Sequence, residues 1–105
     1  MIYVKINNTL YPAIVSGKMA DRDWDNRASK SIKVEMDYDT AIGLFVDGLV
    51  WSIVVQNEVD GDTEYDNSEY SLAGDITDHR DGTITAKMGK LTELEEAYEI
   101  LFGGN

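Results

Sequence analysis

The sequence predicts an α+β fold: a mostly antiparallel sheet or a small partly open barrel of about six strands, with a short middle helix and a C-terminal amphipathic helix. Three observations predict it. Apolar and polar residues alternate in several short segments, which is the period of a half-buried strand. A capping box precedes an apolar stripe of helical period near the end of the chain. The 105 residues suffice for a single domain over residues 1–105.

The first two strands are predicted to form a hairpin. Asn7-Asn8 suits the positive φ of a tight turn, and the second strand runs from residue 9 to about residue 18. Pro12 has no N–H to donate, so we expect a sheet edge near it. The polar residues 19–29 are expected to be exposed. The apolar members of the first and third strands are Ile2, Val4 and Ile6, then Ile32, Val34 and Met36.

A short helix and three more strands follow. Asp39 is expected to cap a helix over residues 40–46 that ends before Gly48. Gly43 inside it costs roughly 1 kcal/mol against Ala, so this helix needs tertiary packing. Residues 49–56 are predicted as a buried central strand, and residues 60–68 as an acidic turn region. Two further strands, residues 70–77 and 84–88, are joined by a hairpin loop at residues 78–82, and we expect a bulge at Gly74.

The C-terminal helix has the clearest signature. Thr92 and Glu95 fit a capping box, and Gly103-Gly104 suits the end of a helix. An apolar stripe lies between them, and we expect it to bury one side of the helix. Its members are Leu94, Ala97, Tyr98, Leu101 and Phe102.

Charge is distributed unevenly along the chain. Net charge is −11; residues 35–78 hold twelve acidic side chains and no Lys or Arg, whereas residues 1–34 hold six Lys or Arg. Such a chain is not expected to bind nucleic acid through a broad phosphate-facing surface. One hypothesis is that the basic first third of one copy meets the acidic middle of another. The simpler interpretation is solubility.

Known catalytic and metal-binding patterns do not match. Counted from Asp60, an EF-hand loop would need Gly where Tyr65 stands and Glu where Ser71 stands. His79 is the only histidine and there is no cysteine, which argues against zinc and against a histidine-activated nucleophile. Asp47 lies in an apolar context, where its simplest role is to end the short helix. We predict no enzyme activity, no catalytic residues, no cofactor and no metal.

One segment is singled out as a protein-interaction candidate. Trp24 stands among alternating charges, and Trp and Arg dominate interface hot spots. In the competing interpretation, Trp24 folds back onto the core and the charges only solvate a hairpin. Trp51, within an apolar strand, is interpreted as core. The candidate interaction residues are Arg22, Asp23, Trp24, Asp25 and Arg27.

Three stretches carry a resemblance in texture, without a diagnostic motif. They are Trp24-Asp25-Asn26-Arg27, the run from Tyr38-Asp39-Thr40-Ala41 through Leu44-Phe45-Val46-Asp47, and Asp78-His79-Arg80-Asp81-Gly82-Thr83. Across most of its length the chain resembles small uncharacterised prophage-encoded proteins of Gram-positive gut bacteria. The resemblance implies a virion, tail, morphogenesis or accessory role, and it assigns no functional residues.

Together these observations predict a non-enzymatic protein-binding module, a phage-type structural or assembly protein that self-associates. Two alternatives stay open: an acidic inhibitor or DNA mimic, and a carbohydrate-binding module that uses Trp24 and the tyrosines. No signal peptide or membrane span is recognisable. We therefore expect a soluble protein that is cytoplasmic in the host bacterium or virion-associated, with protein partners and no membrane partner.

Overall fold

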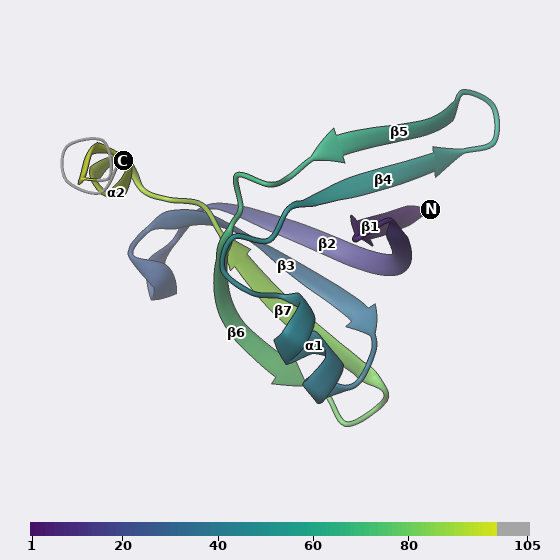
Figure 1. The fold of residues 1–105 in the computed structure, drawn as a ribbon, viewed down its shortest axis with the longest axis horizontal. Coiled ribbons are helices and arrows are strands. Elements are labelled where there is room, and N and C mark those ends of the chain that lie inside the picture. The colour runs from purple at the N-terminus through teal and green to yellow at the C-terminus, as the bar shows by residue number, and fades with distance from the viewer. Residues whose placement is uncertain (99–105) are drawn as a thin grey trace.

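The computed structural model describes residues 1–98. Their strands form one antiparallel sheet in the order β5-β4-β1-β2-β3-β7-β6, which does not close into a barrel (Figure 1). The α+β prediction is confirmed, with seven strands in place of about six. In chain order the elements are β1 (Ile2–Ile6), β2 (Thr9–Asp21), the 3₁₀ turn η1 (Arg22–Trp24), β3 (Arg27–Glu35), α1 (Tyr38–Leu44), β4 (Trp51–Asn57), β5 (Gly61–Asp66), β6 (Leu72–Asp78), β7 (Thr83–Gly89) and α2 (Glu93–Tyr98).

Strand β2 is shared by the two halves of the sheet. Residues 9–12 pair with β1. The pairing with β3 runs from Ala13 to Lys18 and resumes at Asp21 after a shift of register. Pro12 stands at this change of partner, where it pairs with Tyr3 and lies beyond the end of the β3 ladder. A missing N–H therefore costs no ladder bond there, which explains a proline in a strand that is otherwise internal.

The core lies on one face of the bent sheet and is closed by α1, which contacts β6 and β7 (Figure 1). Trp51 is 2 % exposed, as expected for a core residue. Burial of these apolar side chains is the main favourable term for the fold. The buried cluster comprises Val4, Ile6, Ile32, Val34, Ala41, Phe45, Leu49, Trp51, Ile84, Ala86 and Met88.

Residues 67–71 connect β5 and β6, the two opposite ends of the sheet order. The Trp51 indole N–H donates to the Tyr70 carbonyl (3.0 Å). The Lys30 ammonium donates to the Asn67 side-chain carbonyl and lies 4.7 Å from the centre of the Tyr70 ring. These contacts hold the crossing segment against both halves, and burial lowers the pKa of Lys30.

Three local predictions differ from the structure. The expected acidic turn region contains strand β5, whose residues are all exposed, so no buried apolar residue marks it as a strand. Asp37, not Asp39, caps α1, with its carboxylate accepting from the Thr40 N–H (2.6 Å). Asp47 does not end the helix; it accepts from the Ala73 N–H of β6 (2.8 Å).

The C-terminal capping box is confirmed. Thr92 Oγ1 accepts from the Glu95 N–H (3.2 Å), and Glu95 Oε1 accepts from the Thr92 N–H (2.9 Å). The expected burial of one side is wrong for the described part of α2, where Leu94 is 81 % exposed and no residue is buried. Leu101, Phe102 and Gly103-Gly104 lie outside the described residues. Within residues 1–98, neither helix has the length and apolar character needed to cross a bilayer.

Candidate protein-interaction surfaces

The loop that carries Trp24 is a tight corner between β2 and β3. The Asp21 carboxylate accepts from the Asp23 N–H (3.1 Å) and so caps η1. Asp25 and Asn26 both adopt positive φ, at 55° and 58°. Asp and Asn are the non-glycine residues that tolerate this conformation best, because their short polar side chains bond locally. The corner is therefore specified by its own residues.

Asp21 is fully buried below this corner. Its Oδ2 accepts from Ser29 Oγ (3.1 Å) and from Lys87 Nζ (2.6 Å). The hydrogen bond from Lys87 is the main reason that the pKa of Asp21 falls from 3.8 to about 2. A buried charge needs such partners, and these tie the end of β2 to β3 and β7.

Arg27 links the corner to α2. Its guanidinium, 5 % exposed, donates two parallel hydrogen bonds to Glu95 (2.6 and 2.9 Å) and one to the Lys90 carbonyl (3.2 Å). This two-pronged geometry is the strong form of an Arg–carboxylate pair. Arg27 lowers the pKa of Glu95 from 4.5 to about 2. The α2 capping residue thus also anchors the helix to the sheet.

The Trp24 ring covers two glycines. A Cβ atom would approach the ring to 2.9 Å at Gly74 and to 2.6 Å at Gly89. Gly74 coincides with the irregular register between β6 and β7, as the predicted bulge requires. The Arg27 guanidinium lies 5.1 Å and Lys87 Nζ 5.9 Å from the ring centre, within cation–π range.

The five candidate interaction residues differ in exposure. Arg22, Asp23 and Asp25 are exposed, Trp24 is half-buried, and Arg27 is engaged within the chain. The expected exposure of residues 19–29 is therefore found only in part. Asp21, Trp24 and Arg27, which we call the latch, connect β2 and β3 to β6, β7 and α2 through contacts within the chain. A role for Arg22, Asp23, Trp24, Asp25 and Arg27 in binding a partner stays a prediction.

A second surface follows from the backbone directions in β2. The Ala28 carbonyl of β3 accepts from the Lys90 N–H (2.9 Å), so Ala28 faces β7. Successive residues of an antiparallel strand turn their N–H and C=O to opposite sides. Ser29 therefore faces β2, where it pairs with Lys18. Lys18 in turn faces β3.

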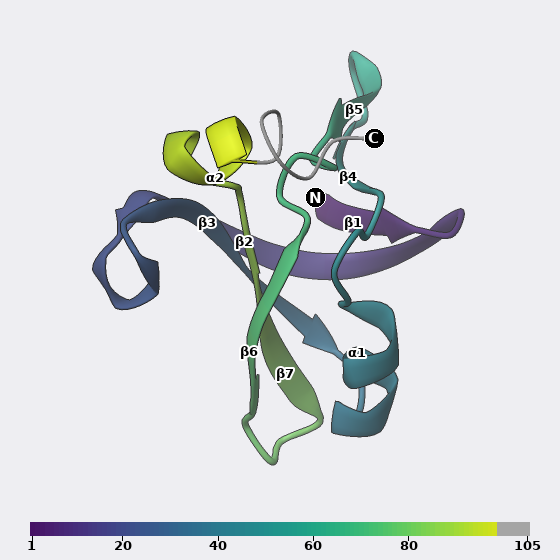
Figure 2. The ribbon, with the colours of Figure 1, turned by 60° about the vertical axis from the view of Figure 1, so that its left-hand side comes forward.

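The neighbours of the β3-facing residues must point the other way. Lys18 and Ser16 face β3, so Val15 and Gly17 direct their N–H and C=O to the opposite side of β2. β1 occupies that side only as far as Pro12. In the described part of the chain, no strand pairs with this side of β2 past Pro12. We call residues 13–20 the free edge of β2; Figure 2 shows β2 continuing past the start of β1.

The free edge is apolar, small and weakly charged. Met19 is 95 % exposed and Ile14 is 70 % exposed. Lys18 is the one charged residue of the segment, in a chain of net charge −11. A hollow of about 680 Å³ adjoins the start of the edge, lined by Met1, Ile2, Pro12, Ala13, Ile14, Lys33, Val34, Glu35 and Thr83. Exposed edges of this kind are templates for pairing with another strand.

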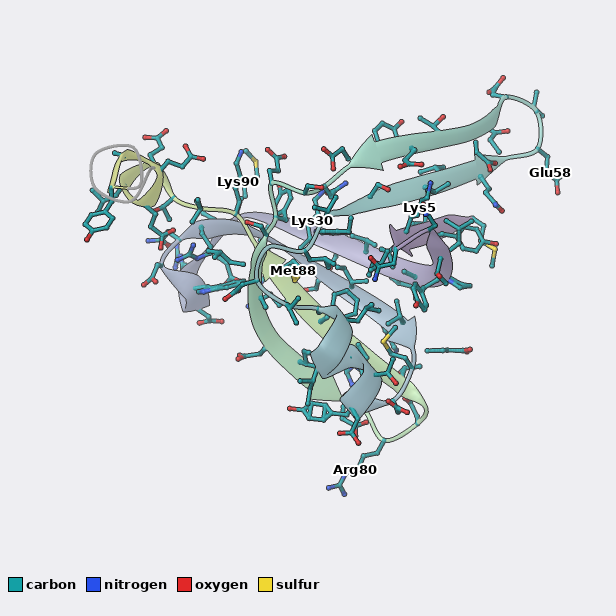
Figure 3. The ribbon with its side chains drawn as sticks, in the orientation of Figure 1. Lys5, Lys30, Glu58, Arg80, Met88 and Lys90 are labelled. Atoms are coloured by element: carbon teal, nitrogen blue, oxygen red, sulfur yellow. The ribbon has the colours of Figure 1, made fainter. Side chains whose placement is uncertain are left out.

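The β4–β5 hairpin is a third surface, and it is acidic. It projects away from the β3-β7-β6 half, with Glu58 at its end (Figures 1 and 3). Asp62, Glu64 and Asp66 alternate along β5 and so share one face. Lys5 pairs with Glu64 (3.3 Å), and Ser52 Oγ donates to Glu64 (2.8 Å). These two donors lower the pKa of Glu64, the hydrogen bond from Ser52 most.

The residues considered for catalysis lie apart from one another. His79 is exposed in the β6–β7 connection, with Nε2 2.7 Å from Thr85 Oγ1. Among residues 1–98, no three His, Asp or Glu side chains are grouped to hold a metal ion. Pro12 predicted a sheet edge near it, and the free edge begins at the next residue. The extent of the edge to residue 20 was not predicted, because it depends on where β1 stops along β2. The exposure of Ile14 and Met19 was not predicted from the sequence.

Comparisons with protein-family models, curated proteins and solved structures find no match to this chain. The surfaces above are therefore interpreted from their own geometry.

We expect Gly89→Ala to destabilise the fold by about 1–3 kcal/mol, because its Cβ would overlap the Trp24 ring and Arg27. Gly43→Ala is the matched control: nothing lies within 4 Å of that position, and helix propensity favours Ala by roughly 1 kcal/mol. Urea unfolding measures both. In the Trp24→Ala background the cost of Gly89→Ala should shrink; an unchanged cost would show that the ring does not lie on Gly89.

Stability should fall in acid through Asp21 and Glu95. Both folded-state pKa values are about 2, below the ordinary values of 3.8 and 4.5. Their contribution is complete above the ordinary values and is lost as pH falls toward about 2. Urea midpoints across this range should drop less steeply for Asp21→Asn and for Glu95→Gln, which keeps the capping box. Wild-type slopes in both variants would contradict this account.

Proposed function

We propose that this chain is a non-enzymatic protein-binding module that self-associates, in a phage-type structural assembly, by adding a strand to the free edge of β2. The observation that carries the proposal is the outward N–H and C=O of Val15 and Gly17, flanked by exposed apolar side chains. A partner strand would satisfy these groups and cover Ile14 and Met19. Main-chain hydrogen bonds supply the affinity in this mode of recognition.

Electrostatics favours the free edge over the acidic β4–β5 hairpin for contact between copies. Two molecules of net charge −11 repel each other. The free edge holds no acidic residue, so contact there brings no carboxylates together. Lys5 and Lys90 already pair with Glu64 and Glu69 of the same chain, at 3.3 and 3.4 Å. These charges are therefore less available for contacts between copies. Self-association through the free edge should therefore strengthen, not weaken, when salt screens the net charge.

One observation favours the inhibitor or DNA-mimic alternative. Asp62, Glu64 and Asp66 form a row with roughly 7 Å between successive residues of one face. A mimic of a duplex needs a second parallel row, and β5 is the last strand of the sheet on that side. Carbohydrate stacking on Trp24 gains no support from a ring that lies against Gly74 and Gly89.

Light scattering coupled to size exclusion tests the proposal over a range of concentrations. We expect a mass above 11.7 kDa that increases with concentration and with salt, from on the order of 10 mM to 1 M. Gly17→Pro should abolish the increase, because it removes an outward N–H without touching the β3 ladder. Gly17→Ala keeps that N–H and is the matched control; its Cβ meets nothing closer than 3.8 Å.

A mass of 11.7 kDa at every salt and concentration would refute self-association and direct attention to the acidic-inhibitor alternative. Association that persists in Gly17→Pro would refute the role of the free edge.

A further inference from the structure

The free edge is complementary to itself. Resting on the proposed function, we propose that the occupant of this edge is the β2 strand of a second copy, paired antiparallel about a twofold axis at Gly17. A twofold contact uses the same surface on both subunits, so each residue and its partner exchange roles. The two sheets would join into one continuous sheet through their β2 strands.

The hydrogen-bonding register permits this pairing. Antiparallel partners exchange both hydrogen bonds only where each faces the other strand. Gly17 faces outward, so Gly17 of one copy can bond Gly17 of the other. The same register sets Val15 of one copy opposite Met19 of the other.

The side chains that meet in this register are compatible. Val15 meets Met19, and Ile14 lies near Ala20, which stands within the shift of register between Lys18 and Asp21, so apolar groups cover apolar groups. Lys18 meets Ser16, and no like charges stand opposite each other, which would be destabilising. Both exposed apolar side chains of the edge are covered.

Strand β5, at one end of the sheet, is a poorer partner for β2, because the residues that direct their backbone outward there carry acidic side chains. The Trp51 carbonyl accepts from the Asn67 N–H (2.9 Å), so alternate residues of β4 face β5 and pair with Thr63 and Tyr65. The residue between these two, Glu64, then directs its backbone outward.

In a head-to-tail contact of β2 with β5, the residues of each strand that direct their N–H and C=O outward would therefore stand opposite each other. The carboxylates of Asp62 and Glu64 would lie beside Val15 and Gly17, while Lys18 would point to the other face. Opposite charges would not meet. Contact between two β5 strands would set acidic side chains against each other. Among these edges, β2 with β2 leaves the fewest unfavourable neighbours.

The contact is small. Six or seven paired residues span about 20 Å, and a contact one strand wide is smaller than the roughly 1,600 Å² of a standard interface. We therefore expect a dimer that dissociates on dilution, so a covalent trap at the axis is the suitable measurement.

Gly17→Cys supplies that trap, because the wild-type chain has no cysteine. A bonded antiparallel pair has Cα atoms about 5.5 Å apart, within the range that a disulfide bridges. We expect Gly17→Cys, oxidised by a glutathione mixture, to form a disulfide dimer at least about tenfold faster than Gly43→Cys, the matched control on α1. Gly43 is also a glycine with open space around it. Both reactions are followed by non-reducing gel electrophoresis.

Equal rates in a chain that self-associates by light scattering would overturn the twofold pairing and leave the proposed function standing. Equal rates in a chain that stays monomeric would overturn both. A fast Gly17→Cys dimer that adding Ile14→Asp does not slow would also contradict the pairing, since that carboxylate would enter the apolar contact with Ala20.

Discussion

The architecture depends on one constraint: β2 changes its partner at Pro12. Thirteen residues of β2 must serve β1 along one side and β3 along the other, and the two ladders meet only at this point. β1 stops there, and within residues 1–98 no strand pairs with that side of β2 beyond this point. The two halves of the sheet enclose the core. The arrangement of the core and the free edge of β2 thus both depend on where β1 ends.

The corner at Trp24 makes this arrangement rigid. A long two-stranded tip would fray without tertiary contacts. Buried Asp21 and Arg27, with partners on β7 and α2, fix the far end of β2, and Trp24 closes over the glycines of β6 and β7. A rigid strand loses less conformational entropy when it pairs with another, which favours the proposed pairing at the free edge.

Sequence periodicity predicted most of the fold, since alternation and capping are local. It identified the core strands, the Thr92–Glu95 capping box and the bulge at Gly74. β5 was missed because an exposed acidic strand shows no apolar alternation. Pro12 predicted a sheet edge near it, but the extent of the free edge could not be predicted, because it depends on the relative lengths of strands that are paired across the sheet. Likewise, Arg27 has the same sequence signature whether it faces a partner or Glu95 of its own chain.

The most direct test is amide hydrogen exchange at single residues of β2, measured by NMR in dilute and concentrated samples. The account predicts that Ser16 and Lys18, which face β3, are protected in both. Val15 and Gly17 should exchange rapidly in the dilute sample and become protected in the concentrated one. Protection of Val15 and Gly17 at all concentrations would show that the edge is already satisfied within the chain. Rapid exchange in a fully associated sample would show that the copies join elsewhere.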